Sequence, residues 1–86
     1  MIEDRHAGAE LASRLLRIPL EVALENSTDL TEVDGFFYWE PVRGGGQIIV
    51  GRDESVLFGI SALSVQQMVE AFAAGRRTDR SLFGTG

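Results

Sequence analysis

The chain has 86 residues, of which 44% are hydrophobic and 24% charged, and its formal net charge is −5. This length predicts a single domain, and the absence of cysteine excludes disulfides and thiolate metal sites. No apolar run approaches the roughly 20 residues of a membrane helix, and the acidic N-terminus lacks an apolar secretory segment, so we expect a cytoplasmic protein. All eight basic residues are arginine, which is typical of a GC-rich bacterial genome.

The N-terminal third predicts a helix followed by a strand. Apolar residues recur three or four positions apart over residues 7–18, which indicates an amphipathic helix that Pro19 ends. Residues 20–25 alternate between apolar and mostly acidic side chains, which favours a half-buried strand. Residues 26–35 are polar and are predicted to form a turn and a loop.

Three further strands and a helix complete the predicted fold. The aromatic run 36–42, the apolar run 48–50 and the run 56–60 are separated by short turns, one of them glycine-rich, which predicts an antiparallel meander. Ser64 and Gln67 form a predicted capping box for the last helix, and Gly75 is expected to terminate it.

The sequence therefore predicts an α+β fold in the order α-β-β-β-β-α, with both helices packed on one face of a four-stranded antiparallel sheet. We expect residues 1–86 to form one domain, with residues 1–6 and 81–86 frayed at its ends.

Charge and aromatic residues together suggest a surface for another protein. Six acids and no base lie between Glu21 and Glu40, a field that repels nucleic acid and attracts a basic partner. Large rings occupy alternate faces of the predicted strand 36–42, and Tyr and Trp often anchor interfaces. The alternative is that the rings fill the core and the acids are solvated. The candidate partner-binding residues are Asp29, Glu32, Asp34, Tyr38, Trp39, Glu40 and Arg43.

Catalytic, nucleotide and metal sites find no support in the sequence. The glycines at 44–46 are followed by an apolar strand and not by the lysine of a phosphate-binding loop. Residues 29–35 fail as a calcium loop, because alignment on Gly35 places Leu30 and Pro41 at positions that need carboxylates. The single histidine, His6, lies in the N-terminal segment that is expected to be frayed. We expect a protein that is not an enzyme and that needs no cofactor, metal or membrane.

Residues 36–75 combine the aromatic residues 37–39, the glycine turn at 44–46, the apolar strand 48–50, Asp53, the strand residues 56–58 and the helix from Val65. In this combination the segment resembles the YrhB-like immunity proteins of bacterial toxin systems. Gln47 departs from the family's proline, and Glu54 and Ser55 replace its glycines. The resemblance implies a protein that neutralises a cognate toxin by binding it. It transfers no binding residue.

The expected function is therefore that of an immunity or inhibitor protein, whose acidic and aromatic surface covers a cationic site on a toxin. Two alternatives remain open. One is a small secretion chaperone or adaptor that holds an apolar segment against the sheet, and the other is a small-molecule-binding subunit.

Overall fold

The computed structural model describes residues 2–41, 45–59 and 64–78. Two helices, α1 (Arg5–Leu16) and α2 (Leu20–Glu25), precede a four-stranded sheet, and a last helix, α3 (Val65–Ala73), follows it. The strands are β1 (Ser27–Leu30), β2 (Gly35–Trp39), β3 (Gln47–Gly51) and β4 (Val56–Gly59), with a 3-10 turn, η1 (Thr31–Val33), after β1. Each strand pairs antiparallel with the next one along the chain. The predicted order of a helix, a four-stranded antiparallel meander and a C-terminal helix is confirmed.

Residues 20–25 form a helix, so the predicted strand at this position is wrong. Pro19 starts the helix, since its carbonyl accepts a hydrogen bond from the N–H of Ala23 at 3.1 Å. Ala23 is fully buried, and Leu20 and Leu24 pack against the same core. Leu20 and Leu24 share one side of either a strand or a helix, so this run of six residues fits both periodicities. Packing of α2 against α1 favours the helix.

The first strand lies at Ser27–Leu30, where the sequence analysis predicts a polar turn and loop. The N–H of Trp39 donates to the carbonyl of Asn26 at 3.1 Å, and the antiparallel ladder with β2 continues from there. Only Leu30 of this strand is buried. A strand at the edge of a sheet needs few apolar residues, because one side of it faces solvent.

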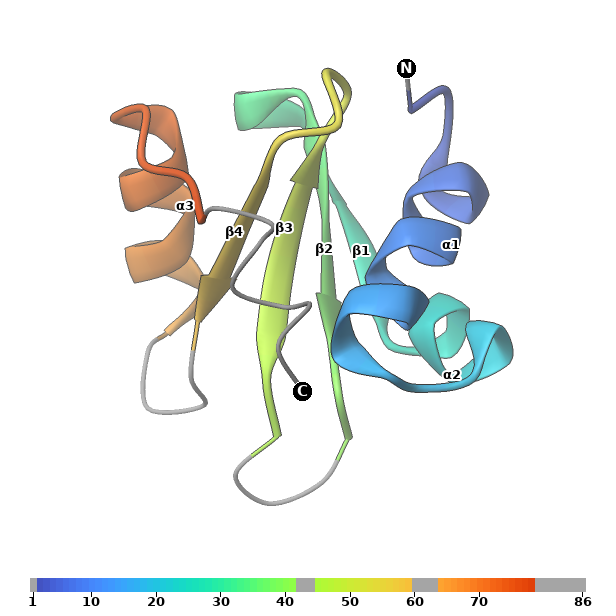
Figure 1. Ribbon diagram of the computed structural model, residues 1–86. Helices are drawn as coiled ribbons and strands as arrows, with labels where there is room; N and C mark the ends of the chain where they lie inside the picture. The colour runs from blue at the N-terminus through green and yellow to red at the C-terminus, as the bar shows by residue number, and fades with distance from the viewer. Residues whose placement is uncertain (1, 42–44, 60–63, 79–86) are drawn as a thin grey trace.

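The helices cover opposite faces of the sheet, so the prediction that they share one face is wrong (Figure 1). Phe36 and Tyr38 of β2 join the core under α1 and α2. Phe37 joins the core under α3, and Trp39 packs against that core. β2 and β3 carry large apolar side chains on both faces of the sheet. These side chains are buried only if a helix covers each face.

Of the N-terminal residues predicted to be frayed, Ile2 and Asp4 contact the rest of the fold, and Met1 lies outside the described residues. Ile2 is buried, and its N–H donates to the carbonyl of Arg52 at 2.9 Å. The carboxylate of Asp4 accepts from the N–H of Ala7 at 2.8 Å and so caps α1. The other predicted frayed segment, 81–86, lies outside the described residues.

Both predicted ends of α3 are confirmed. The hydroxyl of Ser64 accepts from the N–H of Gln67 at 3.1 Å, and the side chain of Gln67 accepts from the N–H of Ser64 at 2.8 Å. Gly75 follows the helix with φ of 94°, a conformation that glycine adopts without strain. In the described ranges, no helix combines the length and apolar character required to cross a membrane.

Candidate functional site

An aromatic hollow of about 420 Å³ opens on the α3 face of the sheet, beyond the first turn of α3. The rings of Phe37 and Trp39 stack with 5.5 Å between their centroids and form one wall. Val65, the first residue of α3, is 41% exposed at its rim. Alternation along β2 places both rings on this face, and α3 covers the inner ring more fully than Trp39. The lining residues are Thr28, Phe37, Trp39, Glu40, Gly45, Gly46, Gln47 and Val65.

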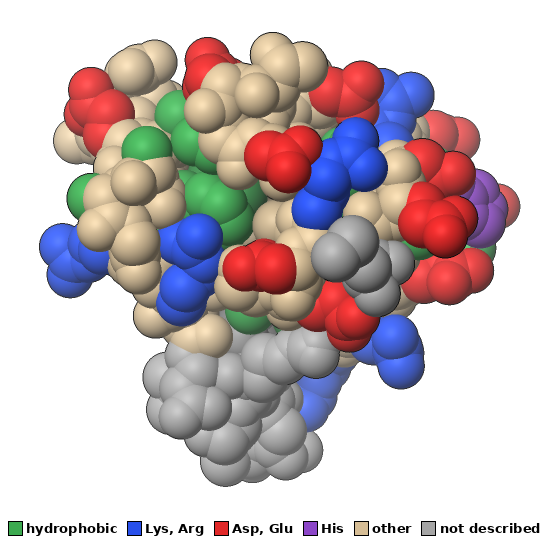
Figure 2. All heavy atoms as spheres, turned by 90° about the horizontal axis from the view of Figure 1, so that it is seen from above, with side chains coloured by type: hydrophobic (Ala, Val, Ile, Leu, Met, Phe, Trp, Pro, Cys, Tyr) green, Lys and Arg blue, Asp and Glu red, His purple; other side chains and the backbone are tan. Residues whose placement is uncertain are grey.

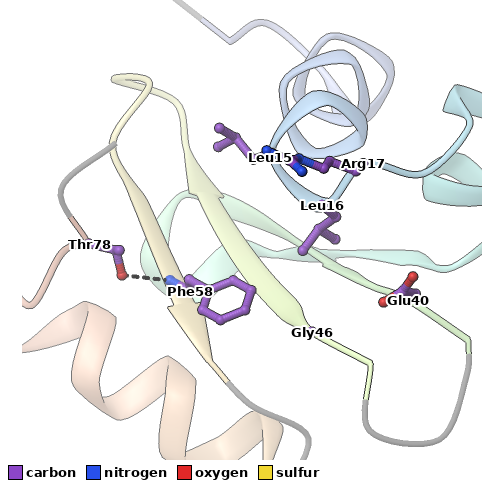
Figure 3. A pocket seen from close by; sticks show the side chains of 7 residues that line it. All are labelled: Leu15, Leu16, Arg17, Glu40, Gly46, Phe58 and Thr78. Carbon is purple, nitrogen blue, oxygen red and sulfur yellow. Dashed lines mark hydrogen bonds between the residues drawn. The ribbon is translucent and has the colours of Figure 1, made fainter. Parts of the chain in front are cut away.

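A second hollow, of about 400 Å³, lies on the α1 face at the same end of the sheet (Figure 3). It exists because α1 ends at Leu16, where Arg17 turns the chain with φ of 58°, and so leaves Phe58 of β4 37% exposed. Glycine suits position 46 because a Cβ there would lie only 2.7 Å from the Phe58 ring. The lining residues are Leu15, Leu16, Arg17, Glu40, Gly46, Phe58 and Thr78.

Some of the predicted acidic residues are paired with an arginine, and others are not. Glu25, Asp29 and Glu32 are exposed, and none of them has an ion-pair partner among the described residues. Asp34, in contrast, accepts from the Nε of Arg52 at 2.8 Å. Figure 2, a view from above, shows acidic and arginine side chains interspersed over this end of the molecule. On β1 and next to it, the exposed carboxylates of Glu25, Asp29 and Glu32 therefore carry charge that no arginine of the described residues neutralises.

Tyr38 is a core residue, so its predicted role as a surface anchor is wrong. Its side chain is fully buried, and its hydroxyl donates to the carbonyl of Arg5 at 2.6 Å. Gly8 of α1 lies against the hydroxyl, and a Cβ at Gly8 would collide with it. Burial raises the pKa of Tyr38 above its usual value, because the phenolate would lie in an apolar environment.

This burial predicts a loss of stability at alkaline pH. The chain has one tyrosine and neither cysteine nor lysine, and arginine stays protonated, so Tyr38 is the side chain that titrates above pH 10. The unfolded chain then loses a proton that the folded chain keeps. Ionisation of Tyr38 should leave the free energy of unfolding unchanged below about pH 10. Above that pH it should lower the free energy of unfolding by about 1.4 kcal/mol per pH unit. Urea denaturation at a series of pH values should show this decline in the wild type and no decline in Tyr38→Phe. An equal decline in both proteins would contradict the prediction.

The remaining predicted residues are divided between the two faces of the sheet. Trp39 is half-buried in the aromatic hollow, whereas Asp29 lies opposite Phe36 and so shares the α1 face. Glu40 is half-buried and borders both hollows. Arg43 lies outside the described residues. The predicted set therefore does not form one patch, although Thr28 links the acidic strand to the aromatic hollow.

One polar cluster near the β3–β4 turn serves the turn itself. The Ser55 hydroxyl donates to Asp53 at 2.5 Å and accepts from the Nε of Arg77 at 2.8 Å. Hydrogen bonds from Ser55 lower the pKa of Asp53. The Arg77 guanidinium also covers the ring of Phe72, 3.5 Å from its centroid. The carboxylate of Asp53 accepts the serine proton, but its lowered pKa makes it a weak general base for activating the serine as a nucleophile.

Metal-binding geometry is not found in the described part of the chain. No three His, Asp or Glu side chains there converge on a point where a cation could be held. His6 is exposed on α1, with its Nδ1 4.0 Å from a carboxylate oxygen of Glu10.

No protein-family model matches the chain, and no curated protein or solved structure matches it significantly. The resemblance to immunity proteins therefore stays a prediction.

Of the residues that line the two hollows, only Trp39 and Glu40 were among the predicted site residues. Thr28 was assigned to a turn, although its place opposite Phe37 follows once Ser27–Leu30 is recognised as a strand. Phe58 was predicted only as part of the strand 56–60, and no sequence signal shows that α1 ends before covering it. Val65 was predicted to follow the capping serine as the start of the last helix, which it is, and Gln47, predicted to precede the strand 48–50, is the first residue of β3.

Proposed function

We propose that this chain is a non-enzymatic protein-binding domain, and specifically a bacterial immunity or inhibitor protein that covers a cationic site on a toxin. The proposal rests on one arrangement, an aromatic hollow next to an edge strand whose carboxylates have no ion-pair partner among the described residues. Trp39 provides the apolar anchor, and Glu25, Asp29 and Glu32 provide the charge.

The two parts of this surface have different physical roles. Trp39 is half-exposed and its ring is held by stacking on Phe37, so a partner side chain can fill the hollow at little cost in ordering. Carboxylates at a rim act at longer range, because they attract a basic partner before contact and are screened by salt. Occlusion of the partner's cationic site would follow from complementary charge, without any chemical step.

The test separates these roles kinetically. With a partner captured by the wild-type chain, Asp29→Asn with Glu32→Gln should slow association several-fold and flatten its salt dependence, while dissociation hardly changes. Trp39→Ala should instead speed dissociation by about 30-fold, equivalent to about 2 kcal/mol. Surface plasmon resonance over a range of salt concentrations measures both rates.

Matched variants control for net charge and for loss of a ring. Glu10→Gln with Glu70→Gln removes the same charge from α1 and α3, and Phe58→Ala removes a half-exposed ring from the other hollow. Both controls should bind nearly as the wild type does. The proposal would be refuted if the captured partner were acidic, or if binding depended neither on the salt concentration nor on Trp39. Captured unfolded export substrates would favour the chaperone, and a ligand-induced rise in melting temperature would favour the small-molecule subunit.

For an immunity protein, the captured partner should be toxic alone. Co-expression with the wild-type chain should restore growth, and co-expression with Trp39→Ala should restore it less.

A further inference from the structure

The two edges of the sheet differ in their main-chain hydrogen bonding. At the β4 edge, the N–H of Thr78 donates to the carbonyl of Val56 at 2.8 Å, and the N–H of Phe58 donates to the Thr78 hydroxyl at 2.9 Å. This edge is therefore occupied by the chain itself. The opposite edge is β1, which pairs with β2 alone among the strands of the described ranges.

The register shows which groups of β1 point away from the sheet. The carbonyl of Asn26 accepts from the N–H of Trp39. The main-chain groups of Thr28 and Leu30 therefore also point toward β2, because they lie two and four residues further along the strand. The alternating residues, Ser27 and Asp29, direct their N–H and C=O groups outward. Half-exposed Ser27 and exposed Asp29 present these groups at the surface.

Side chains along this edge differ between the two faces of the sheet. Thr28 lies on the α3 face and lines the aromatic hollow. Asp29 lies on the α1 face, and Glu25 and Glu32 are exposed on either side of the strand in sequence. An added antiparallel strand would place its own side chains on the same two faces in alternation.

We propose that β1 accepts a fifth, antiparallel strand from a partner segment that alternates basic and apolar residues. The basic side chain opposite Asp29 meets a carboxylate, and the apolar side chain next to Thr28 lies at the aromatic hollow. Main-chain hydrogen bonds to Ser27 and Asp29 hold the segment, as in other cases of strand addition. A second copy of this chain fits less well, because its Asp29 would approach the same carboxylates. This inference rests on the proposed function and specifies how the cationic partner binds.

A synthetic peptide of about eight alternating arginine and valine residues provides the probe. In the antiparallel arrangement, the arginine opposite Asp29 directs its N–H toward β1, and the valines direct theirs away. N-methylation of the arginines should therefore weaken binding by about tenfold or more, whereas N-methylation of the valines should leave it nearly unchanged. A glutamate-valine peptide should not bind. Hydrogen exchange measured by NMR should slow at the N–H groups of Ser27 and Asp29 when the arginine-valine peptide is bound.

Two variants of Asp29 separate charge from hydrogen bonding in the protein. Asp29→Asn and Asp29→Pro both remove the carboxylate, but only proline removes the outward N–H, and an edge strand tolerates proline there. The proline variant should bind the peptide about fivefold more weakly than the asparagine variant. The N-methylated peptides give the same comparison on the wild type if proline unfolds the chain.

The outcomes distinguish this inference from the proposed function. If both N-methylated peptides bind with the same affinity, and Asp29→Asn lowers both affinities equally, strand addition is refuted. The proposal of a cationic partner would then still hold. If no peptide binds, or protection at Ser27 and Asp29 depends only on protein concentration, strand addition is refuted too. Loss of binding confined to the arginine-methylated peptide, with protection at both N–H groups, supports it.

Discussion

Phe72→Ala should lower the free energy of unfolding by about 3–5 kcal/mol, the cost of removing a buried ring from a packed core. Phe72 is 4% exposed and belongs to the core that joins α3 to the sheet. Its ring lies close to Gly51, where a Cβ would be 2.9 Å from it, and the guanidinium of Arg77 covers one face. Neither neighbour can fill the resulting cavity without moving the sheet or a hydrogen-bonded arginine. Urea denaturation followed by circular dichroism measures the change.

Phe58→Ala is the matched control, because it deletes the same ring where 37% of the residue is already exposed. It should cost less than half as much, since less apolar surface is returned to water. Equal midpoints for Phe72→Ala and the wild type would mean that α3 does not stabilise the fold.

Tyr38→Ala should cost a similar 3–5 kcal/mol from the other core. Tyr38 is fully buried under α1, and its hydroxyl bonds to the carbonyl of Arg5. Tyr38→Phe keeps the ring and should cost about 1 kcal/mol, the net worth of one hydrogen bond. The ring and the hydroxyl are thus measured separately by the same denaturation experiment.

Combining Tyr38→Ala with Phe72→Ala tests the two-layer architecture. The two rings belong to different cores on opposite faces of the sheet, so their costs should add within about 0.5 kcal/mol. A sum that falls well short would indicate that the two layers share one packing unit. Since the double variant would be unfolded if the wild type is marginal, a stabilising osmolyte should be present in all four samples.

The sequence predicted the central strands and α3 because these segments carry unambiguous signals. Aromatic and β-branched residues crowd β2 and β3, and the capping box at Ser64 fixes where α3 begins. Residues 20–30 misled the prediction for two reasons. The alternation in 20–25 also fits one and a half turns of helix, and the polar residues of β1 look like a turn because this strand is an edge.

The site was predictable only in its residue types. Alternation along the aromatic strand correctly separated Phe37 and Trp39 from Phe36 and Tyr38, but it could not show which pair a helix would cover more completely. The placement of α3 decided this, and it depends on where the connection after β4 carries the chain. Likewise, no sequence pattern relates Asp34 to Arg52, which are 18 residues apart and meet at 2.8 Å.

The unequal edges of the sheet also limit how copies of this chain could assemble. Sheets that are open on both sides can grow without end, as in fibres, because each added chain offers a new edge. Here Thr78 occupies the β4 edge, so two copies joined through β1 would form a closed pair related by a two-fold axis. The carboxylate of Asp29 opposes even that pairing at low salt. A concentrated solution of the chain should therefore stop at dimers, whereas a domain with two free edges can add a further copy at each side.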